Sequence, residues 1–206
     1  MSEIQSSFRP TVDDITAFLL SAALISTAFI VFYENYTLGA AATTVAGSVL
    51  VLLSREIGQR TVAQWMDAYV ELETSQEGAV TTFLGIIITA LTSLPLLLLF
   101  PLQSEFEGHR YEQWGKSVDA IWAKRQYWLV SGGIIGMMIL FLISLIAGFN
   151  QVAQMTVFFT VMQMLPFDFW GIPTGELDGA YILRWSGFAW LAMMGLNLVF
   201  LGLTLV

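Results

Sequence analysis

The sequence predicts an all-α fold, a polytopic bundle of about six transmembrane helices. Of the 206 residues, 56% are hydrophobic and only 12% are charged, whereas ordinary soluble domains carry about 25% charged residues. The apolar residues gather in runs of about 18 to 24, and each such run can cross a hydrocarbon core of roughly 30 Å. The mean hydropathy is positive. Together these observations indicate an integral, multi-pass membrane protein.

Composition also limits chemistry and partners. The chain has no cysteine, which excludes disulfides and thiolate metal sites. Sixteen acidic residues against eight basic ones give a net charge of −8. This argues against nucleic acid as a partner, because phosphates need a basic surface. Acidic loops with little lysine are typical of salt-adapted proteins, so we expect the lipid bilayer of a salt-adapted prokaryote's cell membrane as the surroundings.

The chain is predicted to begin with a polar tail and two membrane spans. Residues 1–14 lack the basic start of a signal peptide, so the first apolar run is expected to be retained rather than cleaved. A single transmembrane domain is then predicted to cover residues 15–206. The first span, at about 15–33, is free of charge and carries small residues that suit close helix packing in lipid. The second span covers 38–53 and continues as a helix to about Met66.

The middle of the chain is more polar. Residues 67–78 form an acidic connector that we expect to be solvated. The third apolar run, 79–102, contains Pro95 and Pro101, so its end is predicted to be kinked or broken. In residues 103–126 aromatic and charged side chains alternate, which predicts a polar amphipathic segment at the bilayer surface.

Three further spans are predicted in the second half. The fourth, 127–149, contains the segment 131–133 with two consecutive glycines near its start, and glycines let another backbone come close. A short break at 148–150 leads to the fifth span, 152–166. The sixth span covers about 188–206 and is interpreted as a structural helix.

A charged segment, 54–60, ends the second apolar run. Ionisable groups in or beside a membrane span are expensive, so they are candidates for a functional site. Arg55 and Gln59 are four apart on one helix face with Glu56 between them, which is the spacing of a zinc-binding His-Glu-x-x-His helix. A simpler interpretation is that Arg55, Glu56 and Arg60 mark the interfacial end of the span and extend to water.

A second polar segment, 164–184, is rich in glycine, proline and aromatic residues and includes Asp168. Irregular backbone at membrane depth survives only where protein buries it or where it lines a wet cavity. Asp178 is followed by Gly179 at the start of an apolar helix. The simplest role for Asp178 is an N-cap or first-turn carboxylate.

The two polar segments together resemble one family. Leu177-Asp178-Gly179, preceded by Leu165-Pro166, resembles the Asn-x-x-Pro and Leu-Asp-Gly signature of site-2-protease-like intramembrane zinc metalloproteases. Residues 55–60 are similar to the His-Glu-x-Gly-His helix of that family, and 131–133 is similar to its small-residue Ala-Gly-Pro element. The resemblance covers roughly residues 40–206.

The resemblance implies a role for each matching position. In the family two histidines and the Asp of Leu-Asp-Gly bind zinc, and the Glu is the general base on the metal-bound water. Glu56 then occupies the general-base position and Asp178 the third-ligand position. Arg55 and Gln59 stand where the family has histidine, and Gln163 stands where it has asparagine.

These replacements argue against a catalytic zinc. Arginine has no lone pair to donate and stays protonated, and the amide oxygen of Gln59 is a poor zinc ligand. The single histidine, His109, lies in the polar segment and is expected to be an ordinary exposed side chain. We therefore expect no cofactor. Instead, Arg55 is predicted to pair with Asp178 while Gln59 completes the hydrogen bonds, and Glu56 to pair with Arg60.

The function expected from this reasoning is that of a catalytically inactive relative, a binding or scaffold subunit that holds another transmembrane protein. Two alternatives remain open. One is an active membrane-embedded metalloendopeptidase in which Glu56, Asp178 and Asp168 surround a metal with atypical ligands. Zinc is expected as a cofactor only under this alternative. The other is a small transporter or channel subunit whose buried charges line a solute path.

Overall fold

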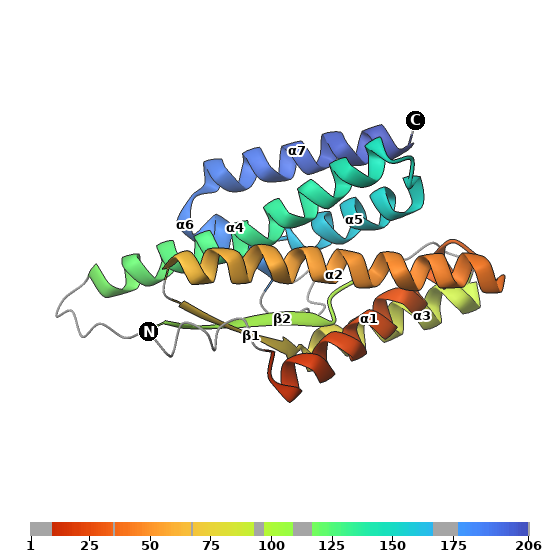
Figure 1. Cartoon of the computed structure of the whole chain (residues 1–206), viewed down its shortest axis with the longest axis horizontal. Coiled ribbons are helices and arrows are strands. Elements are labelled where there is room, and N and C mark those ends of the chain that lie inside the picture. The colour runs from red at the N-terminus through yellow and green to blue at the C-terminus, as the bar shows by residue number, and fades with distance from the viewer. Residues whose placement is uncertain are drawn as a thin grey trace.

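The computed structural model describes residues 10–34, 36–66, 68–92, 97–108, 117–166 and 177–205. In these residues the elements follow in the order α1 (Val12–Phe32), α2 (Leu38–Met66), β1 (Ala68–Thr74), α3 (Gln76–Thr92), β2 (Leu102–Gly108), α4 (Ser117–Ile146), α5 (Asn150–Gln163), α6 (Asp178–Trp185) and α7 (Gly187–Leu205) (Figure 1). Helices dominate, which confirms the predicted helical class. A two-stranded sheet is added to it.

Four of the described helices are long and apolar enough to cross a membrane. They are α1, α2, α7 and the part of α4 from Ala123 to Ile146. The predicted total of six spans is not confirmed, because α3 has 17 residues and α5 only 14. At 1.5 Å per residue a 14-residue helix covers about 21 Å of a hydrocarbon core roughly 30 Å thick.

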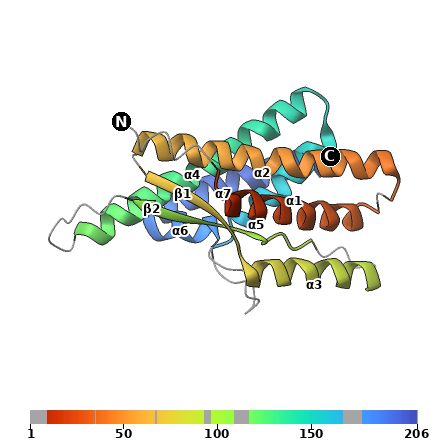
Figure 2. The ribbon, with the colours of Figure 1, turned by 60° about the horizontal axis from the view of Figure 1, so that its bottom comes forward.

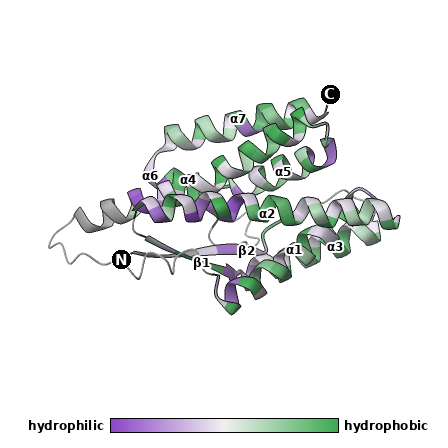
Figure 3. Ribbon diagram, in the orientation of Figure 1, coloured by the Kyte–Doolittle hydropathy of each residue, from purple (hydrophilic) through white to green (hydrophobic). Residues whose placement is uncertain are grey.

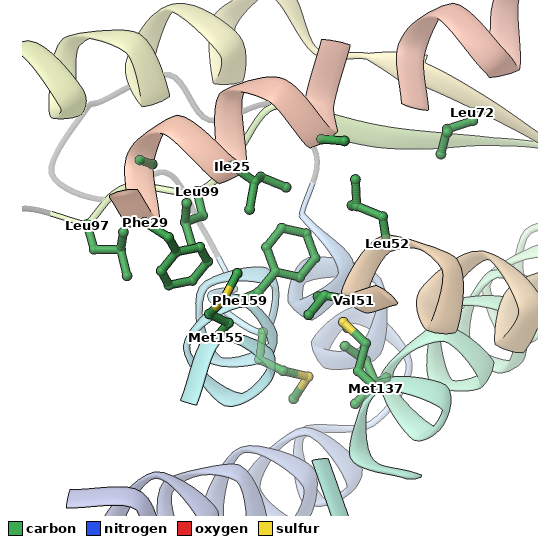
Figure 4. Packing of buried hydrophobic residues seen from close by; sticks show 14 of the residues in the cluster. Ile25, Phe29, Val51, Leu52, Leu72, Leu97, Leu99, Met137, Met155 and Phe159 are labelled. Atoms are coloured by element: carbon green, nitrogen blue, oxygen red, sulfur yellow. The ribbon is translucent and has the colours of Figure 1, made fainter. Parts of the chain in front are cut away.

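Helix α2 lies at the centre of the fold. It packs against α1 and β1 on one side and against α4 and α5 on the other, as Figure 1 shows. Figure 2 shows α3 at the edge of the molecule, and α3 packs on α1. Figure 3 shows mostly hydrophobic residues along α1, α3 and α7, and hydrophilic ones on the half of α2 beside the strands. The apolar core between the helices includes Ile25, Phe29, Val51, Leu52, Met137, Met155 and Phe159 (Figure 4).

Glycines bring the backbones of α2 and α4 into contact, as predicted from residues 131–133. A Cβ atom on Gly132 would lie 2.7 Å from the carbonyl oxygen of Gly58 and 2.6 Å from Cγ2 of Val62. A Cβ atom on Gly136 would collide with the carbonyl oxygen of Ser54. Real side chains do not approach that closely, so α2 and α4 pack this tightly only because these positions are glycine.

Replacing Gly136 by leucine is expected to lower the free energy of unfolding by about 1–3 kcal/mol, the usual cost of overpacking. The added side chain meets a backbone carbonyl that moves only if α2 moves. Thermal denaturation of the purified protein in detergent measures the effect. Gly195→Leu is the matched control, because a Cβ atom on Gly195 of α7 has nothing within 4 Å. Equal losses in the two variants would contradict the packing explanation.

The strands β1 and β2 correct two expectations. They pair antiparallel, with Leu72 opposite Ser104. β1 lies where we expected a solvated connector at 67–78, and β2 replaces the first part, 103–108, of the amphipathic surface segment expected at 103–126. In β1 the buried Val70 and Leu72 alternate with acidic residues, which is the period of a strand with one buried face. Residues 109–116 lie outside the described part, and from residue 117 the chain belongs to α4.

The breaks between helices fall close to the predicted positions. Helix α3 ends at Thr92, before Pro95, which lies outside the described residues. Helix α4 ends at Ile146, and Gly148 has a φ of 78°, a left-handed conformation that glycine adopts without strain. The chain then turns back into α5.

Candidate functional site

An ion pair between α2 and α6 forms the centre of the candidate site. Arg55 donates two hydrogen bonds to the carboxylate of Asp178, from Nε to Oδ2 at 3.0 Å and from Nη2 to Oδ1 at 2.8 Å. Both residues are buried, with 0% of Arg55 and 2% of Asp178 exposed. Charge-assisted pairs of this two-pronged kind are the strong ones. This is the ion pair predicted from the sequence.

Tight packing between α6 and the end of α5 positions Asp178. It is the first residue of α6 and follows Leu177, whose side chain makes no capping hydrogen bond. A Cβ atom on Gly179 would collide with the carbonyl oxygen of Met164, so glycine is required at that position. The carboxylate of Asp178 also lies in the first turn, where the helix dipole favours negative charge. Its simpler expected role and its role in the ion pair are therefore compatible.

Ser104 of β2 links the ion pair to Gln59. Its hydroxyl accepts a hydrogen bond from Nη1 of Arg55 at 3.0 Å and donates one to Oε1 of Gln59 at 2.9 Å. Gln59 was expected to complete the hydrogen bonds of the pair, and it does so through this serine. Sequence reasoning missed Ser104, because an uncharged residue in a segment assigned to the bilayer surface gives no signal for a buried site.

Replacing Ser104 by alanine is expected to cost about 1–3 kcal/mol, because it leaves a buried guanidinium N–H and a buried amide oxygen without a partner. Unfolding of the purified protein by denaturant in detergent measures this cost. Ser54→Ala is the control, since the hydroxyl of Ser54 donates only to the carbonyl of Val51 in its own helix. A cost for Ser104→Ala no larger than that of the control would contradict the bridging role.

The second half of the site joins α2 to α1. Nε of Arg60 donates to Oε2 of Glu56 at 3.1 Å, as predicted for this i, i+4 pair. Nη2 of Arg60 lies 3.3 Å from Oδ1 of Asp14, and Oε1 of Glu56 lies 3.6 Å from Nη1 of Arg55. Asp14, Arg55, Glu56, Arg60 and Asp178 thus form one continuous chain of opposite charges. We refer to these five residues as the charge cluster.

Asp14 was expected in the polar tail and instead belongs to the site. Helix α1 begins at Val12, and Asp14 exchanges hydrogen bonds with Thr11 in a capping box. Its Oδ1 also accepts the backbone N–H of Leu72 in β1 at 2.7 Å. One carboxylate therefore caps α1, holds β1 and pairs with α2. A Thr-x-x-Asp spacing before an apolar run is the signal that could have identified this helix start.

The charge cluster is buried within the protein. Glu56 is 7% exposed and Arg60 is 8% exposed, so the simpler interpretation, in which these charges extend to water at the end of a span, is wrong. Buried charges are tolerated when they are paired and hydrogen-bonded. Each member of the cluster has an oppositely charged partner within 4.0 Å.

The other predicted site residues are not brought into the cluster by any described contact. Gln163 is buried at the end of α5, and its Nε2 donates to the carbonyl of Leu99 at 3.4 Å. Asp168 and His109 lie outside the described residues. Gly179 supports the site through its packing, as described above.

The arrangement does not fit a zinc ion of the kind that the resemblance implies. Both carboxylate oxygens of Asp178 accept hydrogen bonds from Arg55, and a guanidinium repels a divalent cation and offers no lone pair. In the described part of the chain, no group of three His, Cys, Asp or Glu side chains is placed to hold a metal. The geometry is that of a clamp, in which one side chain of α2 fixes both α6 and β2.

The charge cluster also limits what Glu56 can do chemically. Its Oε2 accepts from Arg60, and its Oε1 lies near Arg55, so both oxygens face cations rather than a reacting group. No protein-family model, curated protein or solved structure matches this chain. Function is therefore inferred from the side chains of the cluster and from the surfaces around it.

Proposed function

We propose that this protein is a non-catalytic, site-2-protease-like membrane protein that acts as a binding or scaffold subunit for another transmembrane protein. The single observation that carries the proposal is the salt bridge between Arg55 and Asp178. It links the two polar segments on which the resemblance rests, and it does so with an arginine at a position where the family has a zinc ligand.

A closed site supports the non-catalytic part of the proposal. Arg55 and Gln59 are 0% exposed, and Ser104 is 4% exposed. Glu56 itself is 7% exposed and its carboxylate lies beside two arginines, so little of it is open to a peptide bond. The same contacts make a rigid frame, because α1, α2, α6 and the two strands are all tied to one set of charges. A rigid frame suits a protein whose task is to hold a partner.

Metal content and partner capture together test the proposal. The full chain is purified from its native membrane in mild detergent, its zinc is measured by mass spectrometry, and the chains that co-purify are identified. We expect zinc far below one per chain and a defined transmembrane partner at constant stoichiometry. Asp178→Asn is compared with Glu73→Gln, which also neutralises a carboxylate but at an exposed position on β1.

Two outcomes would replace the proposal with one of the alternatives. Stoichiometric zinc that is lost in Asp178→Asn but kept in Glu73→Gln would indicate a metallopeptidase. Solute flux in proteoliposomes that is abolished by Arg55→Ala would indicate a transporter or channel subunit. A chain that purifies alone from its native membrane would contradict the scaffold role.

A further inference from the structure

We propose that the protein binds the headgroups of anionic phospholipids at a basic and aromatic surface formed by the beginning of α4 and the end of α6. We call this surface the basic patch. Its members are Lys124, Arg125, Tyr127, Trp128, Arg184 and Trp185. The patch goes beyond the proposed scaffold role and does not depend on it, because none of its residues belongs to the charge cluster.

The distribution of positive charge is the first observation. The chain carries eight basic residues against sixteen acidic ones. Arg55 and Arg60 pair with carboxylates inside the charge cluster. The other basic residues that the structure describes are Lys124, Arg125 and Arg184, and all three lie in the basic patch. Among the described residues no carboxylate forms a salt bridge with any of them. In so acidic a chain, three cations without acidic partners among the described residues are an unusual feature.

Aromatic rings join the two helices of the patch. The ring of Tyr127 lies 5.1 Å from that of Trp128 and 6.4 Å from that of Trp185. The guanidinium of Arg184 lies 5.6 Å from the ring centre of Tyr181. Lys124 precedes Tyr127 and Trp128 by about one helical turn and so shares their face of α4. Contacts between α4 and α6 bring the two helices that carry these cations side by side (Figure 1).

The patch lies where membrane spans begin. The spanning part of α4 starts at Ala123, and that of α7 starts at Gly187, directly after α6. Trp128 is 43% exposed and Trp185 is 40% exposed. The end of α2 reaches the same level, because Ala63 packs in one apolar cluster with Leu129 of α4. Exposed tryptophan and tyrosine at the ends of spans are typical of the headgroup region.

A lipid phosphate fits this surface better than a free anion does. Tryptophan at the ends of spans favours headgroup depth, where lipid phosphates are already concentrated and where Lys and Arg are attracted to anionic leaflets. Arg125 is half-buried and Lys124 and Arg184 are exposed, so the phosphate can be reached from the lipid side. Further along α4 and α7, exposed apolar side chains such as Ile135, Ile139 and Leu191 are available to the acyl chains.

Lipid retention tests the proposal. The full chain is reconstituted in nanodiscs of phosphatidylcholine with a minor fraction of phosphatidylglycerol, and the lipids that stay bound are counted by native mass spectrometry. We expect the wild type to enrich phosphatidylglycerol. The triple variant Lys124→Gln, Arg125→Gln, Arg184→Gln should reduce that enrichment by roughly tenfold or more, because each cation near an anionic leaflet changes affinity by about fivefold.

A charge-preserving variant separates electrostatics from damage to the fold. Lys124→Arg, Arg125→Lys, Arg184→Lys should keep the enrichment, and all variants should keep the wild-type thermal midpoint. Equal retention of the two lipids by the wild type would overturn the proposal, as would full enrichment in the glutamine variant. Displacement of the lipid by an excess of glycerol 3-phosphate would also overturn it, because it would show a site for free phosphate anions.

Discussion

Replacing Arg55 by methionine is expected to destabilise the protein by about 3–5 kcal/mol, because removal of one partner leaves a buried charge uncompensated. Asp178 would remain 2% exposed without the guanidinium that donates to both of its oxygens. Methionine keeps an apolar chain in the space of the arginine stem, so loss of packing contributes little. Denaturant unfolding of the purified protein in detergent, followed by circular dichroism, measures the change.

A double-mutant cycle assigns this cost to the ion pair. When Arg55→Met is combined with Asp178→Asn, much of the lost stability should return, since a buried pair replaced by neutral groups is often close to neutral in stability. Arg184→Met is the matched control, because Arg184 is exposed and forms no salt bridge with the described residues. Strictly additive losses in the double variant would contradict the pairing.

The long-range ion pair between Arg55 and Asp178 could be predicted from the sequence. Arg55 and Asp178 are 123 residues apart, yet each is a charge within an apolar chain, and a buried charge needs an opposite partner. The order of the two motifs in the resemblance indicated which partner. The extent of α2 was also predictable, because its apolar run passes into the charged segment without a proline.

Uncharged and short-range features escaped the same reasoning. Ser104 carries no charge, and its place depends on the register of β1 and β2, which pairs it with Leu72. In β1 the alternation covers only seven residues, and its acidic members gave the segment the composition of a solvated connector. Asp14 was assigned to the tail because its partners, Arg60 and the N–H of Leu72, lie in elements that only the folded chain brings together.

Replacing both Arg55 and Gln59 by histidine is expected to create a zinc site. The double variant has the sequence His-Glu-Ile-Gly-His on α2, with both imidazoles on one helix face. In the wild type Arg55 pairs with Asp178, so a histidine at position 55 faces this aspartate, and removal of the guanidinium frees the aspartate oxygens to bind metal. Two histidines, one carboxylate and a water make a common catalytic zinc site. Mass spectrometry of the purified variant should find about one zinc per chain.

Two controls decide whether that zinc is bound at the predicted position. Adding Asp178→Asn to the double variant should remove the metal, because it removes the third ligand. Ile57→His with Thr61→His places two histidines at the same spacing on the exposed face of α2 and should bind no more zinc than the wild type. A folded double variant without zinc would contradict the resemblance but not the Arg55–Asp178 ion pair of the wild type. Zinc with peptidase activity would instead show that this frame lacks only its metal ligands, which would support descent from an active protease.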